Sequence, residues 1–164
     1  MTRINLILPA ELTDQHLFAE FREIKMIPKS LGRTLVSIHR QHPDWVPHGI
    51  MVYNHLLSRI PKHYTLGKGH VYFFYNKGAY LRERYEVIKR ELTARGINYN
   101  TGSVFDPDGH MRNNWLNNWY VPTDAALALI RARIADRIAM KPQWYRKTPT
   151  IDLPQPHKFL HPFP

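Results

Sequence analysis

The stretch NKGAYLRERYEVIKRELTARG, residues 76–96, carries the clearest helical pattern of the chain. Apolar residues recur in it every three or four positions, which is the spacing of one buried face of an α-helix. They are Leu81, Tyr85, Ile88 and Leu92. The side chain of Asn76 can cap the first turn, and Gly96 can end the helix because glycine readily adopts the left-handed backbone conformation found there. The stretch predicts an amphipathic helix that packs on a core.

A second helical segment follows Pro9, with Thr13 or Asp14 as its N-cap. Its apolar stripe consists of Leu17, Phe21 and Ile24. We expect the segment to kink or break near Pro28, because proline lacks the N–H that a helix interior needs, and to resume over residues 30–39.

A third helical segment starts near Pro122 and Thr123 and stops before Pro142. Its buried stripe consists of Leu127, Ile130, Ile134 and Ile138. A chain of 164 residues with 43% hydrophobic content is one ordinary domain with a real core. The prediction is therefore a mainly α fold, a single compact domain of three principal helices with long irregular loops.

The segments between these helices are less regular. Residues 40–64 are rich in His, Pro and Trp and are expected to hold one short helix over 53–60. Residues 97–121 read as a long loop. Residues 71–75 are either a short strand or a buried extended segment, since an apolar run of this length fits both.

Five prolines stand between residues 148 and 164, so this part of the chain cannot form a helix of any length. We expect one α domain at residues 1–147, followed by a Pro-rich extended tail at residues 148–164.

The net charge of +10, from 23 basic and 13 acidic residues, indicates a polyanionic partner. A membrane surface is the weaker alternative, because no apolar run approaches a membrane span and no helix sets a basic face against an apolar one. The apolar run at residues 4–8 is too short for a signal peptide, so we expect a cytoplasmic protein. Without cysteine the chain has no disulfides, thiolate zinc sites or cysteine-ligated iron–sulfur clusters.

The small residue Thr2 follows Met1, and a small second residue favours removal of the initiator methionine. The α-amine of Thr2 would then be the N-terminus. With a reference pKa of about 7.7 to 8.0, roughly a tenth or more of such an amine is uncharged at pH 7, against well under a thousandth of an ordinary lysine. Thr2 is therefore a candidate nucleophile.

The first helix adds polar groups that suit such a nucleophile. At 3.6 residues per turn, His16, Glu20 and Glu23 fall on one stripe, and Gln15 and Arg22 fall on the neighbouring one. A carboxylate, an imidazole and a guanidinium thus share a face. The alternative is a solvated helix face with ordinary surface charges.

Several blocks of the chain resemble the phage-type endonuclease V family of pyrimidine-dimer DNA glycosylases and abasic-site lyases. The blocks are Thr2-Arg3-Ile4-Asn5-Leu6, Asp14-Gln15-His16-Leu17, Arg22-Glu23, Gly67-Lys68-Gly69-His70-Val71-Tyr72-Phe73-Phe74-Tyr75, Leu81-Arg82 and Tyr120-Val121-Pro122. The resemblance extends over both ends and the centre, about two thirds of the chain, when the Pro-rich tail and residues 39–64, which are longer than in the family, are set aside. The N-terminal block is its most specific part.

The resemblance implies an enzyme that acts on cyclobutane pyrimidine dimers in duplex DNA, as a monomer and without a cofactor or metal. In this family the N-terminal amine attacks C1′ of the damaged nucleotide, forms an imine with the opened sugar and cuts the strand by β-elimination. By resemblance Thr2 is the nucleophile and Glu23 the catalytic carboxylate. The positions that contact the lesion and its phosphates are Arg3, Gln15, His16 and Arg22, although His16 could instead make a structural hydrogen bond.

The resemblance extends to the last third of the chain. Arg133 and Arg137 match basic positions that contact the DNA backbone, and their alternative role is solubility. Trp144 and Tyr145 match an aromatic segment near the end of the family's chains; they could stack on unpaired bases, but an aromatic pair after a helix is more often part of a core. In the family an arginine follows the catalytic glutamate at a shorter distance in the sequence than Lys29 follows Glu23. Lys29 is the nearest counterpart of that arginine.

Two other functions fit parts of the sequence. A non-catalytic DNA-binding module would use the same charge, arginines and aromatic residues. A metal-dependent nuclease could use His39 and His42, or His48 and His55, but neither pair has an acidic third ligand at a defined spacing.

Overall fold

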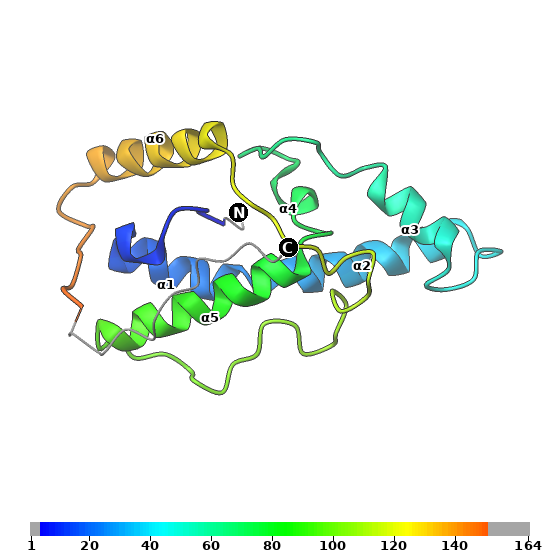
Figure 1. The fold of residues 1–164 in the computed structure, drawn as a ribbon, viewed down its shortest axis with the longest axis horizontal. Helices are drawn as coiled ribbons and strands as arrows, with labels where there is room; N and C mark the ends of the chain where they lie inside the picture. Colours follow the sequence, from blue (N-terminus) through cyan, green and yellow to red (C-terminus); the bar gives the residue numbers. More distant parts are fainter. Residues whose placement is uncertain (1–3, 151–164) are drawn as a thin grey trace, which may run out of the picture.

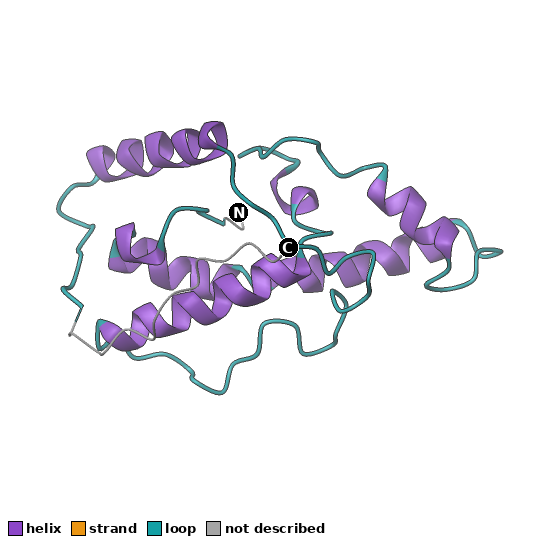
Figure 2. Cartoon of the chain, viewed as in Figure 1, coloured by secondary structure: helices purple, strands orange, loops and turns teal. Residues whose placement is uncertain are grey.

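The computed structural model describes residues 4–150, and within them the chain forms helices joined by loops (Figure 1 and Figure 2). The elements are the short 3-10 helix η1 (Pro9–Glu11) and the helices α1 (Asp14–Glu23), α2 (Met26–Gln41), α3 (Ile50–Leu57), α4 (His70–Phe73), α5 (Gly78–Ala94) and α6 (Asp124–Met140). The predicted mainly α fold is confirmed. Residues 97–121 form the predicted long loop, and the short helix expected over 53–60 is α3, which starts three residues earlier.

The core forms where α1 packs against α5. The predicted apolar stripes of both helices are buried, and the ring of Phe21 on α1 stacks on that of Tyr85 on α5 with their centroids 5.3 Å apart. Gly96 has a φ of +65° and follows α5 as predicted. The cap at the other end was predicted wrongly: Lys77 is the N-cap and makes no side-chain cap bond, while Asn76 Oδ1 accepts a hydrogen bond from Lys77 Nζ.

The break in the first predicted segment precedes Pro28 and is not caused by it. The Ile24 N–H donates to the Glu20 carbonyl at the end of α1, and α2 begins at Met26. Pro28 lies in the first turn of α2, where N–H groups have no partner within the helix, so the missing donor costs nothing there. The helix then continues to Gln41.

Residues 70–73 form the short helix α4, so both expectations for residues 71–75 were wrong. Phe73, Phe74 and Tyr75 are all buried, at 2%, 0% and 1% exposure. A strand would point successive side chains to opposite faces, whereas a helical turn and the bend after it can direct three consecutive rings into the surrounding core.

The helix α6 begins where predicted, directly after Thr123, which is its N-cap: the Ala126 N–H donates to Thr123 Oγ1. It packs through Ile130 and Ile134, and its outer side is exposed. Beyond α6 the chain returns toward α1, and residues 1–3 and 151–164, most of the predicted tail among them, lie outside the described part of the structure (Figure 1).

Candidate functional site

The polar face predicted on α1 lines a cleft between α1 and α6. This inner cleft, of about 170 Å³, is lined by Asn5, His16, Ala19, Glu20, Glu23, Arg133, Ile134, Arg137 and Tyr145. Both predicted α6 arginines therefore lie around the same space as the predicted catalytic carboxylate.

A wider cleft adjoins the inner one. This outer cleft, of about 610 Å³, is lined by Asp14, Gln15, His16, Phe18, Ala19, Arg22, Ile97, Trp144, Tyr145, Arg146 and Thr148. His16, Ala19 and Tyr145 belong to both clefts. The two neighbouring stripes predicted on α1 thus face two adjoining spaces, which could receive two parts of one extended ligand.

His16 stands at the boundary of the two clefts. Its Nδ1 lies 2.8 Å from Thr13 Oγ1, and its ring stacks on that of Tyr145 at a centroid distance of 4.6 Å. Burial lowers the pKa of His16; Glu20 opposes this shift and Arg137 adds to it. The structural hydrogen bond considered above is thus present, and the residue also contributes a neutral, planar surface to the site.

Glu20 is committed to the fold. Its carboxylate accepts hydrogen bonds from Nε and Nη2 of Arg84 and, at 2.8 Å, from Asn5 Nδ2. Burial disfavours the charged guanidinium of Arg84, but the adjacent Glu20 outweighs this and raises its pKa. Glu20 is therefore buried and committed to Arg84 and Asn5, and Glu23 is the second carboxylate that lines the inner cleft.

The start of the described chain is held by the side chains of Tyr64, from the segment before α4, and of His70, the first residue of α4. The Ile4 N–H donates to His70 Nε2 at 3.0 Å, and the Tyr64 hydroxyl donates to the Ile4 carbonyl at 2.8 Å. His70 Nδ1 lies 2.7 Å from the Thr65 carbonyl, so the ring carries its proton on Nδ1 and accepts through Nε2. Burial, with Glu20 as a further cause, raises the pKa of Tyr64, which keeps its hydroxyl a donor.

Thr2 and Arg3 lie outside the described residues. The sequence analysis also missed Asn5, Tyr64, His70 and Arg84 as residues that organise the site. His70 and Asn5 stand in blocks that resemble the family, but nothing in the sequence indicates that His70 bonds to Ile4, 66 positions away, or that Asn5 bonds to Glu20. Their roles depend on tertiary packing.

The predicted ligand residues Gln15 and Trp144 meet through the backbone. Gln15 Nε2 donates to the Trp144 carbonyl at 2.7 Å, and the Arg146 N–H donates to Gln15 Oε1 at 2.9 Å. This clamp holds the C-terminal segment against α1. The Trp144 side chain is 63% exposed, so its expected place in the core is wrong, whereas Tyr145 is partly buried against His16.

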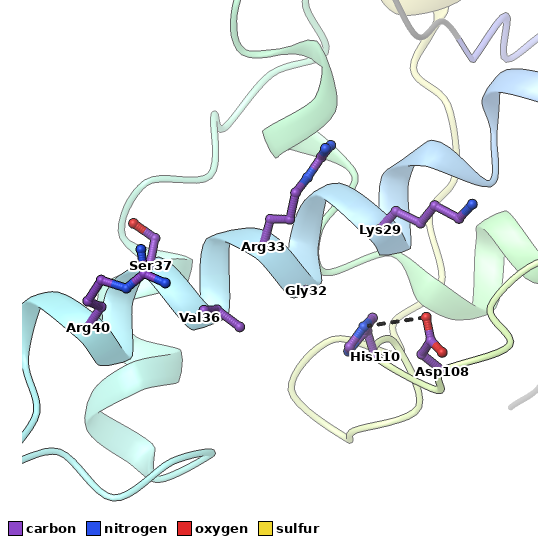
Figure 3. A pocket seen from close by; sticks show the side chains of 8 residues that line it. All are labelled: Lys29, Gly32, Arg33, Val36, Ser37, Arg40, Asp108 and His110. Carbon is purple, nitrogen blue, oxygen red and sulfur yellow. Dashed lines mark ion pairs between the residues drawn. The ribbon is translucent and has the colours of Figure 1, made fainter.

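Lys29 is not brought to either cleft. It is exposed on α2 and lines a separate cavity of about 670 Å³ (Figure 3). Arg22, by contrast, is exposed and lines the outer cleft.

The histidines proposed for a metal nuclease have other neighbours. The rings of His42 and His55 pack with Trp45, and His48 Nδ1 lies 3.3 Å from the Tyr53 hydroxyl. Among residues 4–150, no group of three or more His, Cys, Asp or Glu side chains is placed to hold a metal ion. In the same part of the chain, none of the helices has both the length and the apolar character required to cross a membrane.

Residues 1–104 match the sequence model of a family described as pyrimidine dimer DNA glycosylase. The match includes all of α1, with Gln15, His16, Arg22 and Glu23, and extends past α5. The helix α6 and the aromatic residues after it lie beyond the match.

Proposed function

The chain belongs to the pyrimidine dimer DNA glycosylase family, and on this premise we propose that it cuts DNA at cyclobutane pyrimidine dimers as a combined glycosylase and abasic-site lyase. The nucleophile in this proposal is the α-amine of Thr2, and the carboxylate that assists it is Glu23. Membership of the family makes the chain a DNA repair glycosylase; the lyase step and the residues are our proposal.

One observation carries the mechanism: the beginning of the chain is anchored beside the inner cleft. Asn5, whose neighbour Ile4 is held through both backbone polar groups, lines the cleft together with Glu23. Thr2 precedes Ile4 by two residues, and two extended residues span at most about 7 Å. The covalent chain therefore keeps the α-amine within reach of the cleft that holds the proposed carboxylate.

The reaction follows from these groups. The uncharged amine attacks C1′, the bond from C1′ to the base breaks, and the base leaves with the bonding electrons. The sugar ring opens to give an imine between C1′ and the amine. Glu23 takes the proton from C2′, and the bond between C3′ and its oxygen breaks to release the phosphate. The negative charge of Glu23 also stabilises the positive charge that develops on the sugar and the imine.

The remaining residues of the two clefts bind the substrate in this proposal. Arg133 and Arg137 place positive charge beside Glu23 in the inner cleft, and Arg22 places positive charge in the outer cleft. All three arginines suit phosphate groups. Arg3 and Lys29 are proposed as further phosphate contacts. The exposed ring of Trp144 can stack on a base that leaves the duplex, since C1′ of a stacked nucleotide is shielded and must be turned outward.

Borohydride trapping tests the proposed function directly. A duplex with one defined thymine dimer, incubated with the protein and borohydride, is expected to yield a covalent adduct, because reduction of the imine prevents its hydrolysis. Peptide mapping by mass spectrometry should place the link on the α-amine of Thr2. A link on a lysine side chain, or efficient cutting by protein that fully retains Met1, would refute the assignment.

A positioning role for Tyr64 can be tested with a matched pair of variants. Tyr64→Phe removes only the hydroxyl that holds the Ile4 carbonyl, and Tyr75→Phe removes a hydroxyl that contacts Ser30 and Thr34 on α2. Loss of one hydrogen bond at the anchor is expected to slow imine formation at saturating enzyme roughly fivefold to tenfold, because the amine is held less well at C1′.

Tyr75→Phe is expected to keep the wild-type rate, although it loses comparable stability. Single-turnover trapping rates and thermal unfolding of both variants check this. Equal rates for the two variants would show that the Ile4 anchor has no part in positioning the amine.

A further inference from the structure

The helix α2 presents a basic surface that lies outside both clefts and of which the proposed function uses only Lys29. Lys29, Arg33 and Arg40 are exposed, and all three line the cavity shown in Figure 3. The residues of α2 include no Asp or Glu. In Figure 3 these three side chains extend from different turns of the helix.

This surface differs from that of α5. On α5, Lys89 and Arg90 have carboxylate partners: Lys89 Nζ lies 3.3 Å from Glu86 Oε2, and Arg90 Nη2 lies 3.1 Å from Glu83 Oε1. The ion pairs found within residues 4–150 include none with Lys29, Arg33 or Arg40. The positive charge of α2 is therefore available to an external anion, whereas that of α5 is largely neutralised.

The basic surface of α2 continues toward the outer cleft. Only two residues separate α1 from α2, and Arg22, near the end of α1, lines that cleft. Lys25 stands three residues after Arg22 and four before Lys29, and both cations add to the lowering of its pKa by burial. A row of positive charge thus leads from the outer cleft onto α2, which extends away from α6 toward α3 (Figure 1).

A loop forms the opposite wall of the cavity on α2. Asp106 holds it by accepting hydrogen bonds from the N–H groups of His110 and Met111. The ring of His110 packs on Gly32, where an added Cβ would lie 2.5 Å from its Nε2. Because Gly32 has no side chain, the loop can approach α2 closely and form a defined wall beside the arginines.

We propose that Lys29, Arg33 and Arg40 bind phosphates of the undamaged duplex on one side of the lesion. The proposal rests on the proposed function and extends its substrate contact beyond the damaged nucleotide. From Lys29 to Arg40 the helix rises about 16 Å, at about 1.5 Å per residue. One DNA strand advances about 3.4 Å per nucleotide, so this surface would span about five phosphates. A duplex matches it better than a compact anion because the charges are spread along a line.

The salt dependence of binding to an undamaged duplex tests the proposal. Each phosphate contact contributes about 0.9 to the slope of log K against log salt concentration, so Arg33→Ala and Arg40→Ala should each flatten that slope by about one unit. Each should also weaken binding about twofold to fivefold, as expected for exposed ionic contacts. Arg90→Ala is the matched control, because Arg90 is exposed but already paired with Glu83 and should leave the slope unchanged.

Shortened substrates locate the contact. On a dimer-containing duplex truncated on one side of the lesion, the affinity loss caused by Arg33→Ala should disappear, and on a duplex truncated on the other side it should persist. Unchanged slopes for both α2 variants would overturn the proposal, as would an equal change in Arg90→Ala, which would indicate a general charge effect. An acidic protein as the true partner would give unchanged slopes.

The two proposals fail separately. The wild-type protein is assayed in parallel for cutting and trapping on dimer DNA. If it cuts while the α2 variants keep the wild-type slope, only the α2 surface is refuted. If it neither cuts nor traps, the proposed function is refuted, while the slopes still decide whether α2 binds duplex DNA.

Discussion

Replacement of Glu23 by Gln is expected to leave binding of dimer-containing DNA close to wild type and to abolish most strand cutting. Glutamine keeps the size of the side chain and much of its hydrogen bonding, but it removes the negative charge and the basic oxygen. Loss of a positioned acid–base group costs a factor of about a hundred to ten thousand in rate, and loss of electrostatic stabilisation adds a comparable factor. Single-turnover rates at saturating enzyme, together with dimer-DNA affinities, check both parts.

Glu86→Gln is a suitable control for this experiment. Glu86 is a partly exposed carboxylate on α5 paired with Lys89, far along the sequence from the α1 residues of the clefts, and its replacement should leave the cutting rate unchanged. Glu20→Gln is unsuitable, because it would disrupt the buried pair with Arg84 and confuse loss of fold with loss of chemistry. A Glu23→Gln protein that cuts at near wild-type rate would disprove the proposed active site and reopen the non-catalytic DNA-binding module as an explanation.

The local part of the fold could be predicted from the sequence. The apolar stripe of α5, the cap at Thr13, one of two candidates, and the start of α6 after Thr123 depend on neighbouring residues, so periodicity and residue type were sufficient. The break before α2 was placed too late because proline was taken as its cause. Helix propensity alone also gave no sign that residues 70–73 would form a helical turn, since their conformation follows from burying adjacent rings.

In the candidate site, too, features set by neighbouring residues could be predicted, and features set by distant residues could not. Helical spacing predicted that His16 and Glu23 share a face, and the structure brings them together around the inner cleft. Helical spacing could not show that Glu20, on the same stripe, is bonded to Arg84, because Arg84 lies 64 positions away in the sequence. The exposure of Trp144 likewise depends on the clamp that Gln15 forms with the backbone of the returning chain.

Two residues added before Thr2 are expected to eliminate imine formation while dimer DNA is still bound. The addition converts the α-amine of Thr2 into an amide, which is no longer a nucleophile, and it moves the new terminal amine up to about 7 Å away from its former position. Because Glu23 and the arginines of the clefts are unchanged, affinity for the lesion should fall much less than the rate. Borohydride trapping and a binding assay on the same duplex measure the two effects.

An extension that a specific protease removes provides the control, since cleavage that restores Thr2 as the first residue should restore trapping. The pH dependence of the restored protein gives a second check. Only the uncharged amine attacks C1′, so below its pKa, about 7.7 to 8.0 for an ordinary α-amine, the rate of imine formation should rise about tenfold per pH unit and then level off. Undiminished trapping by the extended protein would show that another amine is the nucleophile. The anchoring of Ile4 by Tyr64 and His70 would then have only a structural purpose, because the chain end would no longer need to be held at the cleft that contains Glu23.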